Sequence, residues 1–79
     1  MNLTLLSSTE KKSYSIVWLE VNTPLGNFVV QEGHAPKIVL LADNKPITFL
    51  LKNGKQETTT IKNGILEVTR DAATILLIK

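Results

Sequence analysis

ITFLLKNGKQETTTI, residues 47–61, places two runs of strand-favouring residues on either side of Asn53-Gly54. Threonine, β-branched and aromatic residues fit the pleated, half-buried surface of a β-sheet. Asn-Gly between two such runs is the strongest short signal for a β-hairpin, because both central residues of a type I′ turn need positive φ. We therefore expect strands at 47–52 and 55–61, joined by a type I′ turn.

Six further β-type runs lie on both sides of this hairpin, separated by turn-forming residues: 3–6, 14–21, 28–31, 37–42, 65–69 and 74–78. A second Asn-Gly pair, Asn63-Gly64, precedes the run at 65–69 at hairpin spacing. Apolar residues nowhere keep a helical period over ten or more positions. The pattern predicts an all-β fold, an antiparallel β-sandwich of two sheets or a small barrel, with about eight to ten short strands.

Two of the runs, Ile16–Leu19 and Leu76–Ile78, are apolar at consecutive positions. One face of an antiparallel sheet normally meets water, so a strand that is apolar on both faces needs an explanation. Either a partner covers the second face or the core is tightly curled. Runs this short do not show which face points outward.

The composition restricts the class of protein. Seventy-nine residues make a single domain, 1–79, and the chain has no cysteine, so we expect no disulfide and no thiolate metal site. The net charge is only +2 and the basic residues are spread along the chain, which argues against a nucleic-acid partner. No segment approaches the roughly 20 apolar residues of a membrane span. We expect a soluble cytoplasmic protein without direct membrane insertion or a signal peptide.

The single histidine, His34, lies between Glu32 and Lys37 and invites a catalytic interpretation. Nucleophilic catalysis, however, needs a nucleophile, a base and an orienting acid that converge, and no serine motif accompanies this histidine. One histidine without cysteines gives no zinc ligand pair, and no glycine-rich phosphate loop or calcium loop is present. We therefore expect no catalytic residue, metal or cofactor. A small hydrolase that uses His34 is the weakest of three interpretations.

The segment Gly33-His34-Ala35-Pro36 has a conformational explanation instead. Glycine gives freedom in φ, while proline fixes its own φ and restricts Ala35 to extended conformations. We interpret the four residues as a structural turn, in which His34 is a hydrogen-bonding pin rather than a base.

Three motifs together carry a resemblance to a known family. Gly33-His34-Ala35-Pro36 is followed about thirty residues later by NGILEV, residues 63–68, and then by ATIL, residues 73–76. In order and spacing the chain resembles, from about Leu3 to Leu77, the N-terminal β-sandwich of the epsilon subunit of the F-type ATP synthase. Glu32 stands where that family usually has proline, and Asn63 where it has a first glycine.

The resemblance implies a sandwich of ten strands and a role without chemistry. Such a domain is a non-catalytic rotor subunit of the central stalk, which links the gamma subunit to the c-ring in ATP synthesis coupled to proton transport. It is peripheral, at the cytoplasmic face of the bacterial inner membrane. Family members usually continue into a C-terminal helical hairpin, whereas this chain stops at Lys79, either as a natural short form or because the helices were removed. In both cases we expect no helical regulation or ATP binding.

Loop residues follow by the same resemblance. We expect the segments Thr23–Gln31 and Gly33–Lys37 to form one end of the sandwich, on the side of the c-ring. The candidate ring-facing residues are Leu25, Gly26, Asn27 and Gln31. The face that meets the gamma subunit stays unassigned.

The alternative is a free-standing β-sandwich module for protein–protein interaction, unrelated to the synthase. Gene neighbourhood separates the two interpretations, because a gene directly downstream of the catalytic beta subunit supports the first and an isolated gene the second.

Overall fold

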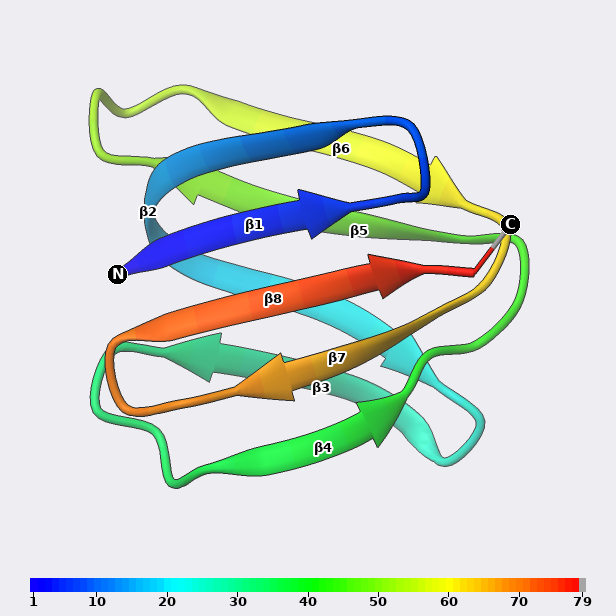
Figure 1. The fold of residues 1–79 in the computed structure, drawn as a ribbon. Helices are drawn as coiled ribbons and strands as arrows, with labels where there is room; N and C mark the ends of the chain where they lie inside the picture. Colours follow the sequence, from blue (N-terminus) through cyan, green and yellow to red (C-terminus); the bar gives the residue numbers. More distant parts are fainter. Residues whose placement is uncertain (79) are drawn as a thin grey trace.

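Eight β-strands form the regular structure of residues 1–78, the part of the chain that the computed structural model describes (Figure 1). Each strand overlaps a run predicted from the sequence, so the all-β prediction is confirmed. The strands number eight, not the ten that the resemblance implies. They are β1 (Asn2–Leu6), β2 (Lys11–Thr23), β3 (Gly26–Gln31), β4 (Lys37–Leu40), β5 (Lys45–Leu51), β6 (Gln56–Ile61), β7 (Gly64–Val68) and β8 (Ala72–Leu77).

The strands form one continuous sheet that folds over into two layers. The order is β4-β7-β8-β1-β2-β5-β6, with β3 paired to β2. Figure 1 shows the layers face to face: layer A consists of β4, β7, β8, β1 and the start of β2, and layer B of β3, the end of β2, β5 and β6. The predicted pair of separate sheets is therefore corrected, because β2 belongs to both layers.

The prediction that all strands are antiparallel is wrong for one pair. β1 and β8 run parallel, with Asn2 opposite Ala72 and Leu6 opposite Leu76, whereas the other neighbours are antiparallel. Side chains alternate between the two faces in parallel and antiparallel strands alike, so alternation by itself does not give the direction of a strand.

Alternate residues of both layers point inward and meet in one core. Leu3 of β1, Leu66 of β7 and Ile75 of β8 come from layer A, and Val30 and Ile47 come from layer B; all are fully or almost fully buried. Tyr14 closes the core at one side, where its ring centroid lies 4.9 Å from that of Phe49.

A shift in register within β2 adjusts which residues face this core. The ladder between β2 and β5 is irregular between Ile16 and Trp18. Because of this bulge, Ile16 and Leu19 are both fully buried although they are three positions apart, and Val17 is exposed. The apolar run at 16–19 is therefore explained partly by the bulge and not by a partner alone.

The hairpin at Asn53-Gly54 forms, but with a different turn from the one predicted. Leu51 N–H donates to Lys55 O at 2.8 Å and Gly54 N–H donates to Leu51 O at 2.9 Å, which makes a three-residue loop. Gly54 has φ of 92° while Asn53 does not have positive φ, so the turn is type I followed by a left-handed glycine and not type I′. Asn53 Oδ1 accepts the Lys55 N–H at 2.9 Å and stabilises this wider loop.

The second Asn-Gly pair is not a hairpin at all. β6 lies in layer B and β7 in layer A, and Asn63 lies where the chain crosses between them. Gly64 is buried against β8: a Cβ placed on it would lie 2.9 Å from the backbone oxygen of Leu76. Close approach of two strands, and not a left-handed turn, requires glycine here.

Replacing Gly64 with alanine should therefore destabilise the fold. The added methyl group meets backbone, which cannot move like a side chain, so we expect a loss of about 1–3 kcal/mol in the free energy of unfolding. Urea denaturation of the two proteins measures this. An unchanged free energy of unfolding would contradict the close approach of Gly64 to β8.

Candidate functional site

The outer face of layer A carries a row of apolar side chains that crosses four strands. Leu40 of β4 lies opposite Ile65 of β7, Ile65 opposite Leu76 of β8, and Leu76 opposite Leu6 of β1. Leu40 is 60% and Leu76 46% exposed, and Ile38, two residues before Leu40, is 73% exposed. A contiguous exposed apolar patch of this kind marks an interaction surface more often than scattered apolar residues do. We call these five residues the apolar row.

The outer face of layer B is mixed by comparison. Polar residues flank or replace the apolar ones in its cross-strand rows, and the hydroxyl oxygens of Thr48 and Thr58 lie 3.1 Å apart. No continuous apolar row forms among the described residues of this face. Two of its cross-strand rows are Gln31-Trp18-Leu50-Gln56 and Val29-Glu20-Thr48-Thr58.

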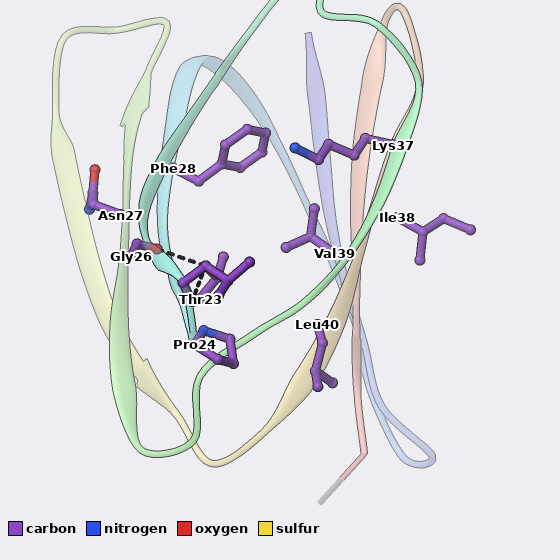
Figure 2. A pocket seen from close by; sticks show the side chains of 10 residues that line it. Thr23, Pro24, Gly26, Asn27, Phe28, Lys37, Ile38, Val39 and Leu40 are labelled. Atoms are coloured by element: carbon purple, nitrogen blue, oxygen red, sulfur yellow. Dashed lines mark hydrogen bonds between the residues drawn. The ribbon is translucent and has the colours of Figure 1, made fainter.

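A groove of about 460 Å³ runs between β3 and β4, where each layer ends in an edge strand (Figure 2). Phe28 of β3 and Val39 of β4 point into it from opposite sides, whereas Ile38 points away (Figure 2). Lys37 Nζ lies 4.5 Å from the centroid of the Phe28 ring, a cation–π contact at one end of the groove. Lys37 is the only charged residue among those that line it.

The segment Gly33-His34-Ala35-Pro36 connects β3 to β4 across the end of this groove. Gly33 has φ of 84°, a left-handed conformation, and its N–H donates to Arg70 O at 3.0 Å. His34 N–H donates to Gln31 O at 3.1 Å, and His34 Nδ1 lies 2.8 Å from Ala35 O. These bonds connect the turn to β3 and to the loop between β7 and β8.

The imidazole of His34 contacts an aromatic ring and a backbone carbonyl. Its ring stands edge-on to Phe28, with the centroids 5.3 Å apart, and its Nδ1 is occupied by a backbone carbonyl. Glu32 is directed to the amino group of Met1, at 3.8 Å, and not to the imidazole. Among residues 1–78 no three histidine, cysteine or acidic side chains gather where they could hold a metal ion.

The predicted ring-facing residues are not brought together. Leu25, Gly26 and Asn27 belong to the hairpin between β2 and β3, where Leu25 is fully exposed and Thr23 Oγ1 donates to Gly26 O at 2.8 Å (Figure 2). Gln31 lies at the other end of β3, some 17 Å away for a strand of this length. The expectation that the segments Thr23–Gln31 and Gly33–Lys37 form one end of the sandwich is therefore wrong, because β3 is part of the first segment and its length separates the hairpin from the turn at Gly33.

The apolar row is the feature that sequence reasoning missed. Its residues come from four strands far apart in the chain, and only the register of the ladders aligns them. The single signal available was the double-sided apolarity of the run at 76–78, in which Leu76 and Ile78 are indeed exposed. No helix among the described residues is long and apolar enough to span a membrane.

The sequence matches a known family over almost its whole length. Residues 2–78 match the family described as ATP synthase, Delta/Epsilon chain, beta-sandwich domain. No curated protein matches the sequence.

Solved structures share the fold. A chain of the Euglena gracilis mitochondrial ATP synthase, in a structure of its OSCP/F1/c-ring, superposes with a TM-score of 0.87 at 22% identity, covering 98% of this chain and 49% of that one. A chain from the central stalk and c-ring of the Tetrahymena thermophila mitochondrial ATP synthase superposes with a TM-score of 0.82 at 14% identity, covering 100% of this chain and 63% of that one. The chain thus spans between about half and two thirds of the length of these two.

Replacing Gly33 with alanine tests the turn. The left-handed backbone costs an L-residue about 1–2 kcal/mol, so the free energy of unfolding should fall by that amount. Gly33→Asn is the matched control, since asparagine tolerates this region better than alanine, and it should cost less. Urea denaturation of both variants measures the difference; equal stability of Gly33→Ala and the parent would show that the turn does not need this conformation.

Proposed function

Because the chain belongs to the family of ATP synthase delta/epsilon β-sandwich domains, we propose that it is a non-catalytic rotor subunit of the central stalk, which links the gamma subunit to the c-ring in ATP synthesis coupled to proton transport. The domain would bind by surface contact and transmit torque. The observation that carries the proposal is the family match over residues 2–78, together with an outer face suited to a protein partner.

We assign the gamma subunit to the outer face of layer A. Stable protein–protein interfaces have an apolar centre and a polar rim. The apolar row supplies such a centre, and Glu67, Thr74 and Thr4, which follow Ile38 in the neighbouring cross-strand row, supply polar groups beside it. Layer B offers no comparable centre on its described outer face.

We assign the c-ring to the hairpin between β2 and β3. Leu25 is fully exposed at its tip, Gly26 and Asn27 are exposed beside it, and the hairpin carries no charge. The turn is held by Thr23, whose Oγ1 accepts the Leu25 N–H at 3.1 Å and donates to Gly26 O. An uncharged tip that is held in shape by Thr23 and exposes one leucine suits contact with the loops of a ring. Gln31, at the opposite end of β3, is left out of this contact.

The proposed location follows from these partners. A subunit bound to gamma and to the ring is a peripheral part of a membrane-bound enzyme, and in a bacterium it lies at the cytoplasmic face of the inner membrane. The helical hairpin and its ATP site, usual in the family, have no counterpart in residues 1–78, where the structure contains no helix.

The gamma contact is tested by replacing Leu76 with lysine. A charge in the middle of the apolar row would have to be buried against the partner, so binding to the gamma subunit of the same organism should weaken more than about tenfold. Thr58→Lys, on the outer face of layer B, is the matched control and should bind like the parent. Calorimetric titration measures all three; failure of the parent chain to bind gamma would refute the proposed function.

The ring contact is tested with single cysteines, which the absence of cysteine in the chain makes unambiguous. Leu25→Cys in assembled enzyme should cross-link to a cysteine placed in the polar loop of the ring subunit. Gln31→Cys and Asn53→Cys should not, because the end of β3 and the loop between β5 and β6, to which these residues belong, lie at the opposite end of the sandwich from the β2–β3 hairpin (Figure 1). If Gln31→Cys cross-linked to the ring and Leu25→Cys did not, the ring would contact the end of the sandwich opposite the β2–β3 hairpin.

A further inference from the structure

β4 is an edge strand, and the backbone N–H and C=O groups on its outer side pair with no other strand. It pairs only with β7. Leu41 N–H donates to Gly64 O at 3.0 Å, and alternate residues of an antiparallel strand bond to the same neighbour, so Val39 and Lys37 face β7. The N–H and C=O groups of Ile38 and Leu40 therefore point away from the sheet, along the groove between β4 and β3.

β4 is short, with four residues, and has Lys37 at its start, but at Ile38–Leu40 this edge carries no charge, proline or bulge. Natural edges are blunted by short length, lysines, prolines, bulges or inward-pointing charges. The ladder from β4 to β7 is regular, and the only charge on β4 is Lys37 at its start, drawn aside over the Phe28 ring. The side chains of Ile38 and Leu40 are 73% and 60% exposed. This edge thus combines unpaired backbone hydrogen-bonding groups with exposed apolar side chains.

The backbone decides what kind of molecule fits the groove. An apolar small molecule placed along β4 would bury the N–H and C=O groups of Ile38 and Leu40 without partners, which costs free energy for each group. An extended polypeptide satisfies them, as in other cases of strand addition. Its alternate side chains would face the groove beside Val39 and Phe28, and a carboxylate near Lys37 would match the one charge there.

Ile38 and Leu40 also belong to the apolar row. A strand added to β4 would therefore extend layer A sideways and continue the face that the proposed function assigns to the gamma subunit. From this continuity we infer that the partner on the outer face of layer A also adds an extended segment to the free edge of β4, apolar where it faces the groove and acidic opposite Lys37. The inference rests on the proposed function, since that partner is the gamma subunit.

Amide hydrogen exchange on the complex of this chain with the gamma subunit of the same organism tests the inference. In the free chain the amides of Ile38 and Leu40 should exchange quickly, and in the complex they should be slowed at least about tenfold. The amides of Thr58 and Thr60, on the free edge of β6, are the internal control and should exchange equally in both states. Protection of Ile38 and Leu40 only in the complex supports strand addition.

Substitution separates the backbone from the side chain. Ile38→Pro removes the outward N–H but leaves the β4–β7 ladder intact, so the variant should stay folded and bind gamma about five to ten times more weakly, as expected for one lost backbone hydrogen bond. Ile38→Ala keeps the N–H and should lose less. Thr60→Pro, the same change on the edge of β6, should bind like the parent.

Each other result overturns the inference in a distinguishable way. Tight gamma binding with Ile38 and Leu40 amides still exchanging quickly would refute strand addition while leaving the proposed function standing. Absence of gamma binding would refute both. In the chain alone, slow exchange of the Ile38 and Leu40 amides that becomes slower at higher protein concentration would show that a second copy occupies the edge. That result would overturn the choice of partner.

Discussion

Strand β2 runs through both layers and fixes their relative position. Its first residues pair with β1 in layer A, and its last residues pair with β3 and β5 in layer B, so a single strand holds both layers in register. Ile16 N–H donates a hydrogen bond to Met1 O at 2.9 Å, at the point where β2 passes from layer A to layer B. The bulge beside it turns Leu19 and Val21 into the core. Without that adjustment Trp18 and Glu20 would point inward, and Glu20 would be buried without a partner.

The surface properties follow from this arrangement. Once β2 fixes the position of β1, the pairings of β1 with β8 and of β8 with β7 determine which residues line up across layer A. The apolar row is a product of that register: a slip of one residue in β8 would replace Leu76 on the outer face by a neighbour. The groove forms because β3 and β4 are the edge strands of the two layers on the same side of the molecule.

The sequence allowed the positions of all eight strands to be predicted, since strand-favouring runs and turn residues are local signals. Features that depend on contacts between distant residues could not be predicted.

The run at Ile16–Leu19 shows apolar residues but not the bulge that divides them between core and surface. Asn63-Gly64 has the composition of a hairpin turn, yet Gly64 is required by contact with Leu76 O on another strand. The turn around His34 could be recognised, but the expectation of a single loop cluster did not account for the length of β3, which separates this turn from Leu25. The apolar row needs the registers of four strands and is invisible in any one of them.

The parallel pairing of β1 with β8 has a kinetic consequence. Asn2 must find Ala72, almost the whole length of the chain away, and closing so long a loop precedes any gain from the contact. During synthesis β1 can pair with β2 at once, but its other edge waits until β8 has left the ribosome. The centre of layer A therefore forms last, and Leu6 and Leu76 meet only in that step. The apolar row is complete only on a fully folded chain, so an unfinished or misfolded copy does not present it to a partner.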